Sequence, residues 1–163
     1  MVKNSQKSFY TYLILTILYA AMIFYLSSRQ AVPQPSDFLM MDFLLKLAGF
    51  IELIGLGSLL IPAYLAYLHL DKLLHAVLFT GFGFLAYLTI NNTKAAKYAP
   101  IFVLMIGAIY AVTDEVHQSF VVGRTPSSLD FLSDVIGILF AIATVYCVKL
   151  IKAPSPQKKE YDN

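Results

Sequence analysis

The chain has 163 residues, of which 58% are hydrophobic and only 13% are charged. A soluble domain carries about 25% charged residues, so the composition excludes an ordinary soluble domain and predicts an integral membrane protein. The net charge of +2 does not indicate a nucleic-acid partner. The single cysteine, Cys147, excludes an intramolecular disulfide and lies in an apolar run, where a buried, inert thiol is expected.

The first apolar run, residues 9–26, reads FYTYLILTILYAAMIFYL. Its length is close to the minimum of about 17 residues for a spanning helix. The run could instead be the hydrophobic part of a signal peptide, but it is long for that role and no small-residue cleavage site follows closely. We therefore predict a retained transmembrane helix.

The next segment, residues 37–70, is apolar but is interrupted by charges, glycines and a proline. Charges near the bilayer centre are costly, so a simple span is disfavoured. Asp42, Lys46 and Glu52 fit one polar edge of an amphipathic helix in the interface. The part after Gly57 is either re-entrant or the start of the next span. We expect an interfacial or re-entrant helical hairpin packed against the other helices.

Three further spans are predicted over residues 71–90, 100–112 and 130–151. The middle one is short and begins at Pro100, a residue that suits a first helical turn. The polar tail, residues 153–163, is expected to be disordered. The predicted fold is all-α: one transmembrane domain, residues 1–152, built as a bundle of four spanning helices with the hairpin between the first and second.

Lysines indicate the orientation of this bundle. They precede the first span, lie between the second and third, and follow the fourth. With four spans these places share one side, which the positive-inside rule assigns to the cytoplasm. We therefore expect both termini in the cytoplasm, and residues 27–70 and 114–129 on the extracytoplasmic face.

Polar side chains gather on that outer face, first at the start of the second span. Asp71 and His75 are four residues apart and share one helical face. Each has an ordinary structural interpretation: Asp71 interacts favourably with the helix dipole, and His75 could be a packed, hydrogen-bonded histidine. Lys72 could extend to the lipid headgroups.

The segment DEVHQ, residues 114–118, follows the third span. If the helix continues through it, Asp114, His117 and Gln118 share one face. Glu115 lies three residues before Gln118, so those two side chains are also neighbours.

The fourth span begins with a third polar group. Asp130 and Asp134 lie one helical turn apart, and Ser127 or Ser128 could cap the helix. An unpaired carboxylate at position 134 is costly inside an apolar helix. It should therefore pair with a nearby cation or histidine, line a water-filled cavity, or be protonated.

The three groups together predict one shared polar pocket, in which Arg124, Lys72 or His75 pairs with Asp134. The alternative is a purely structural cluster of ion pairs. We favour the pocket because an ionisable residue inside a membrane marks a functional site by default.

These residues also carry a family resemblance. DKLLH, then DEVHQSF, GR and SSLD resemble the sequence blocks of the VanZ-like family of bacterial integral membrane proteins, and YLSS at the end of the first span is a looser match. The matching positions are Asp71, Lys72, His75, Glu115, Gln118, Phe120, Gly123, Arg124, Asp130 and Gly137. The resemblance implies a membrane location and a cell-envelope role, such as resistance to the glycopeptide teicoplanin.

The chain departs from the family pattern at three positions. Asp134 stands where the family usually has Asn, His117 adds a titratable group, and Val122 replaces a common proline. The change at position 134 adds a carboxylate to the pocket, so a family role cannot be transferred to it directly.

Two classes of function fit the predicted pocket. One is an enzyme acting on a lipid-linked or cell-wall precursor, with acid–base residues drawn from His75, Glu115, Asp71 and His117. The other is a non-enzymatic protein that binds such a precursor, a glycopeptide or a partner enzyme. A small lipid transporter is a further alternative. Residues expected to bind ligand are Arg124, Lys72, Gln118, Asp130, Asp134, Ser127 and Ser128. A metal-dependent variant, in which Asp, Glu and His at the helix ends bind a divalent ion, stays open, but no metal ligand is assigned. Membrane lipids are the expected surroundings.

Overall fold

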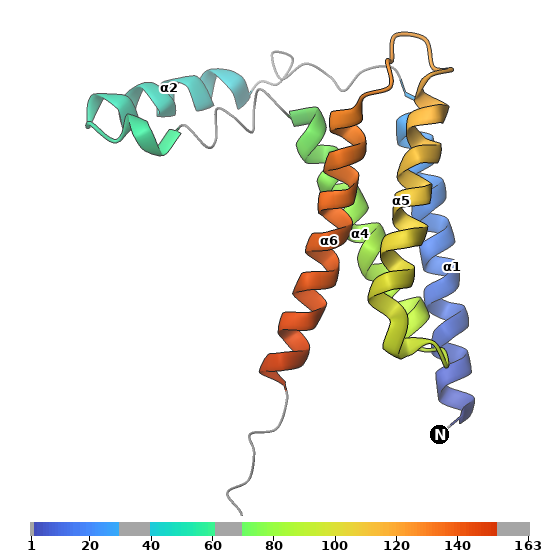
Figure 1. Ribbon diagram of the computed structural model, residues 1–163. Helices are drawn as coiled ribbons and strands as arrows, with labels where there is room; N and C mark the ends of the chain where they lie inside the picture. The colour runs from blue at the N-terminus through green and yellow to red at the C-terminus, as the bar shows by residue number, and fades with distance from the viewer. Residues whose placement is uncertain (1, 30–39, 61–69, 153–163) are drawn as a thin grey trace, which may run out of the picture.

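The structure is a computed structural model that describes residues 2–29, 40–60 and 70–152, and these residues are helical with short connections (Figure 1). Four helices are long and apolar enough to cross a membrane, which confirms the predicted all-α membrane fold. The elements are α1 (Val2–Ser27), α2 (Met40–Leu53), the 3₁₀ helix η2 (Gly57–Leu60), α4 (Leu70–Asn91), the 3₁₀ helix η3 (Ala96–Tyr98), α5 (Ala99–Gln118) and α6 (Ser128–Ile151).

Helix α5 is longer than the predicted span. Pro100 lies in its first turn, as expected, but the helix continues past Val112 to Gln118. The polar segment DEVHQ contains no glycine or proline, so nothing in it breaks the hydrogen-bonding pattern of the preceding helix. The polar side chains of residues 114–118 are therefore held on a rigid helical turn rather than on a loop.

Helix α4 lies in contact with α1, α5 and α6, and its contact with α6 is the most extensive. The two backbones approach closely at Gly137 of α6, where an added Cβ atom would lie 3.0 Å from the backbone nitrogen of Thr80 and would collide with the carbonyl oxygen of Ala76. The Thr80 hydroxyl donates a hydrogen bond of 3.1 Å to the Gly137 carbonyl. Small residues allow this kind of close packing between membrane helices.

Aromatic rings fill the space between α4 and α5. The ring of Tyr110 lies 5.0 Å from that of Phe82 and 5.6 Å from that of Phe79, measured between centroids. The Tyr110 hydroxyl also donates a 2.6 Å hydrogen bond to the carbonyl of Ala20. This single side chain therefore connects α5 to both α4 and α1.

The outward faces of the helices are apolar and exposed, as lipid contact requires. Helix α6 turns only a narrow stripe inward, made of Asp130, Asp134, Gly137, Ile138 and Ala141. Cys147 lies outside this stripe and is exposed. The prediction of a buried thiol is therefore wrong, because an apolar run in a membrane helix does not distinguish lipid-facing from core positions.

Helix α2 lies apart from the four long helices (Figure 1). Among the described elements it contacts only η2, so the expected packing of this segment against the bundle is wrong for the residues that the structure describes. Lys46 and Glu52 are both exposed, in keeping with a polar edge on this helix. The rest of the predicted hairpin, residues 37–39 and 61–69, and the tail, residues 153–163, lie outside the described residues.

The lysine-bearing connections lie together at one end of the bundle. The start of α1, the connection between α4 and α5, and the end of α6 share this end in Figure 1. Lys149 reaches back to α4, where its ammonium donates to the Tyr87 hydroxyl at 2.9 Å and to the Asn91 side-chain oxygen at 3.1 Å. The polar groups predicted to form the pocket lie at the opposite end.

Candidate functional site

A cavity of about 780 Å³ lies at the end of the bundle opposite the lysine-bearing connections. It is bounded by the last turns of α1, the first turns of α4, the end of α5 and the connection from α5 to α6. The residues that line it include Ile23, Leu26, Arg29, Asp71, Leu74, His75, Val77, Asp114, Gln118 and Arg124.

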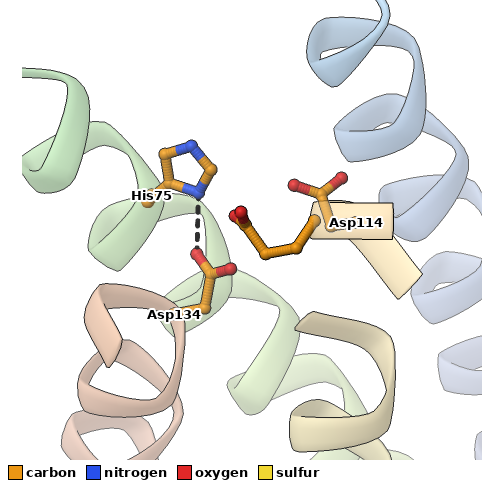
Figure 2. Close-up of side chains that lie close together, drawn as sticks. His75, Asp114 and Asp134 are labelled. Atoms are coloured by element: carbon orange, nitrogen blue, oxygen red, sulfur yellow. Dashed lines mark hydrogen bonds and ion pairs between the residues drawn. The ribbon is translucent and has the colours of Figure 1, made fainter. Parts of the chain in front are cut away.

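His75 and Asp134 form the innermost polar contact (Figure 2). The His75 Nδ1 atom lies 2.9 Å from Asp134 Oδ1, and the two residues are 8% and 0% exposed. They meet because Gly137, one turn after Asp134, lets α6 approach α4 closely. Asp134 therefore pairs with the histidine, one of the three partners considered from the sequence.

Helix α5 contributes two buried carboxylates beside this pair. Asp114 lies opposite His75 and Asp134 in Figure 2, and its Oδ2 atom accepts a 2.8 Å hydrogen bond from the Gln118 side-chain amide. Glu115 Oε2 accepts a 2.6 Å hydrogen bond from the backbone N–H of Ser127. The end of α5 is thus tied to the start of α6.

Ser127 occupies the N-cap position of α6, as predicted, but its side chain makes no capping hydrogen bond. Its contribution is the backbone N–H that binds Glu115. Ser128 is exposed. Both serines line a separate, shallower depression of about 490 Å³ with Glu115, so their hydroxyl groups do not line the main cavity.

A second, more exposed set of charges surrounds Asp71. The Lys72 ammonium lies 3.3 Å from Asp71 Oδ2 and also contacts Asp130. The Lys72 ammonium is thus paired with two carboxylates of the predicted polar groups. Arg124 lies 3.8 Å from Asp71 Oδ1 and donates a 3.3 Å hydrogen bond from Nε to the carbonyl of Arg29.

His117 faces away from the buried carboxylates. Its Nε2 atom lies 2.9 Å from the Ser28 hydroxyl, and its ring lies 4.1 Å from that of Phe24. One helical turn of α5 therefore divides its polar residues: Asp114, Glu115 and Gln118 are buried in the bundle, while His117 packs on α1.

Residues of α1 and α5 add to the site beyond the candidates selected from the sequence. Asp114 is 3% exposed and lies within the buried cluster. Ser27 and Arg29 of the α1 terminus line the cavity. In the sequence, the four-residue spacing between Asp114 and Gln118 indicated that Asp114 belongs to the site. The YLSS match near residue 27 indicated the same for the end of α1.

The profile of the VanZ/LLP1 family matches residues 9–151. The chain belongs to the VanZ/LLP1 family. The match covers α4, α5 and α6 and all the polar residues that surround the cavity, so the site lies within the part of the chain that defines a VanZ/LLP1 protein. No curated protein and no solved structure shows significant similarity to the chain.

Proposed function

We propose that this VanZ/LLP1 protein binds an anionic, lipid-linked cell-envelope precursor on the extracytoplasmic face of the bacterial cytoplasmic membrane. The observation that carries the proposal is the composition of the main cavity. Its lining includes both charged or polar side chains and apolar side chains. A ligand that is complementary to both kinds of side chain has a polar headgroup and a hydrocarbon chain.

The polar part of the cavity offers hydrogen-bond donors suited to an anion. A guanidinium group has five N–H donors and binds phosphate or carboxylate in a two-pronged geometry. Arg124 uses Nε for the Arg29 carbonyl and has only a long contact of 3.8 Å with Asp71. It therefore keeps N–H groups for a ligand headgroup, and Arg29 lines the same cavity.

The apolar part of the cavity has the character of a lipid-facing surface. Leu26, Leu74 and Val77 are 41%, 37% and 57% exposed and line the cavity on α1 and α4. In a bilayer such side chains are in contact with hydrocarbon at no cost. A lipid chain could therefore lie along them while its headgroup stays at the polar end.

The distribution of lysines supports an extracytoplasmic location for this cavity, since it lies at the end of the bundle away from the lysine-bearing connections (Figure 1). Cysteine labelling tests the orientation. In a Cys147→Ser background, a membrane-impermeant thiol reagent should label Ser127→Cys in intact cells and should leave Thr93→Cys unlabelled. The reverse pattern would place the cavity in the cytoplasm and contradict the proposal.

The binding proposal is tested with an arginine variant and a matched lysine control. We expect the purified protein to retain a lipid-linked cell-wall precursor, detected by mass spectrometry, and Arg124→Ala to retain at least tenfold less. Removing one charge-assisted contact costs about 1.5–3 kcal/mol, which corresponds to that factor. Lys97→Ala, at the opposite end of the bundle, should bind as the unmodified protein does.

In cells, the same variants should show whether the envelope phenotype depends on the cavity or only on the amount of protein in the membrane. Arg124→Ala is expected to abolish any reduction in teicoplanin susceptibility conferred by the protein, while membrane levels stay normal. Equal precursor binding and equal susceptibility for Arg124→Ala and Lys97→Ala would remove the cavity from the proposed function.

A second candidate function, acid–base catalysis on the bound precursor, is favoured by one observation. His75 lines the cavity and is held by a buried carboxylate 2.9 Å away, an arrangement that orients an imidazole for proton transfer. Incubation with the lipid-linked precursor should then yield a product that His75→Gln does not form. Tight binding with unchanged precursor would leave binding alone as the function.

A further inference from the structure

Four potential metal ligands from three helices converge beside the cavity. His75 of α4, Asp114 and Glu115 of α5 and Asp134 of α6 each place one ligand atom within 4.8 Å of those of the other three. We propose that these four side chains bind a divalent transition-metal ion, manganese or zinc. The proposal assigns ligands to the metal-dependent alternative that the sequence left open, and it holds whether or not the cavity binds a lipid-linked precursor.

The carboxylates are oriented in the way that metal ligands are. Each is at least nine-tenths buried: Asp134 is 0% exposed, Asp114 3% and Glu115 9%. In each, one oxygen is held by a neighbour, namely His75, Gln118 and the Ser127 backbone N–H respectively. Within the described part of the chain, the second oxygen of each has no hydrogen-bond partner.

Three free, buried carboxylate oxygens in one place need an explanation. A buried polar atom normally has a partner, because leaving it without one costs about 1–3 kcal/mol. Oxygens that are fixed by one neighbour and free on the other side are the usual arrangement around a metal ion, where the outer neighbours orient the ligands.

The charge of the cluster leads to the same conclusion. Three carboxylates lie close together in a membrane protein, where like charges repel strongly. In the described ranges no lysine or arginine forms an ion pair with these three carboxylates: Lys72 contacts Asp71 and Asp130, and Arg124 lies 3.8 Å from Asp71. A bound dication would neutralise most of the negative charge that the imidazole of His75 alone does not balance.

The donor set selects the class of ion. Imidazole nitrogen suits zinc and other transition metals, while carboxylate oxygens suit manganese, magnesium and calcium. One histidine with three carboxylates therefore fits manganese or zinc better than calcium. Ligand atoms that are each about 2.0–2.2 Å from a common ion lie roughly 3 Å apart, so the four ligand atoms, which lie within 4.8 Å of one another, would draw closer together around a bound ion.

The position of the ion relative to the cavity follows from its ligands. His75 and Asp114 line the main cavity, whereas Asp134 lies fully buried behind them. An ion held by the four side chains would therefore have its accessible side toward the cavity. Its charge would add to that of Arg124 at the polar end.

Manganese binding to the full-length protein in detergent tests the site. After treatment with EDTA and buffer exchange, Mn²⁺ is titrated and the free ion is measured by its electron paramagnetic resonance signal. We expect one Mn²⁺ per chain, displaced by one equivalent of Zn²⁺. Asp134→Asn and Asp114→Asn should each weaken Mn²⁺ binding at least tenfold, because each removes the negative charge of one ligand. Glu52→Gln, an exposed carboxylate of α2, serves as the matched control and should bind as the unmodified protein does.

Thermal unfolding distinguishes a lost ligand from a lost fold. In EDTA, Asp134→Asn should unfold at the same temperature as the unmodified protein or higher, since Asn can still accept a hydrogen bond from His75 and repels its neighbours less. Added Mn²⁺ should raise the unfolding temperature of the unmodified protein and of Glu52→Gln, but not that of Asp134→Asn. No uptake of Mn²⁺ or Zn²⁺, or equal affinity in all four proteins, would overturn the proposal and leave a cluster that shares protons instead.

Discussion

The two ends of the helical bundle are held together by different kinds of interaction. At the end near the α4–α5 connection, the packing is apolar and α6 is tied to α4 by Lys149, which bonds to the neutral Tyr87 and Asn91 side chains. At the opposite end, buried charges from three helices depend on one another, as in the His75–Asp134 pair. The comparison indicates that the half of the bundle near the α4–α5 connection is held by apolar packing and neutral hydrogen bonds, whereas the opposite half contains the buried ionisable residues of the candidate site. Three changes test this division, from the largest expected effect to the smallest.

The largest effect is expected at Gly137, where the scaffold and the site meet. Gly137→Leu should lower the free energy of unfolding by about 3 kcal/mol or more, because its side chain would collide with the backbone of Ala76 and Thr80. Thermal unfolding in detergent measures this. Gly49→Leu in α2, where nothing lies within 4 Å of an added Cβ, should leave stability nearly unchanged. Equal stability of the two variants would contradict the close approach of α4 and α6.

An intermediate effect is expected from the His75–Asp134 pair. A double-mutant cycle with His75→Ala and Asp134→Ala should give a coupling free energy of about 1–3 kcal/mol, because the two buried side chains are in direct contact. Denaturant unfolding of the single and double variants measures it. The cycle of His75→Ala with Asp71→Ala should give a smaller value, since Asp71 pairs with Lys72 and Arg124 instead.

The smallest effect is expected at the end near the α4–α5 connection. Lys149→Met should cost at most about 1 kcal/mol, because it removes two hydrogen bonds to neutral groups from an exposed side chain. Precursor and Mn²⁺ binding should be unchanged. A loss of either binding activity in Lys149→Met would show that the two ends are coupled, and the division between scaffold and site would fail.

Much of this architecture was available from the sequence. Apolar run length and low charge content predicted four spanning helices in an all-α fold, and motif spacing placed Asp71, His75, Glu115, Arg124 and Asp134 at one end. These predictions succeed because hydropathy and helical periodicity are local properties of the chain. The same signals failed for Cys147 and for the packing of residues 37–70, since apolar character alone does not say whether a side chain meets lipid or protein.

By itself, therefore, the sequence determined the class of fold, the spanning helices and the set of ionisable residues brought to one end. Only the tertiary structure decided the pairing: Asp134 with His75, Glu115 with the Ser127 backbone, and His117 directed to α1. The physical reason is that the pairing of side chains depends on how each helix is rotated about its own axis. The rotational setting of each helix about its axis is set by contacts between helices, above all the close approach at Gly137 and the packing of the aromatic rings, and no local pattern specifies it.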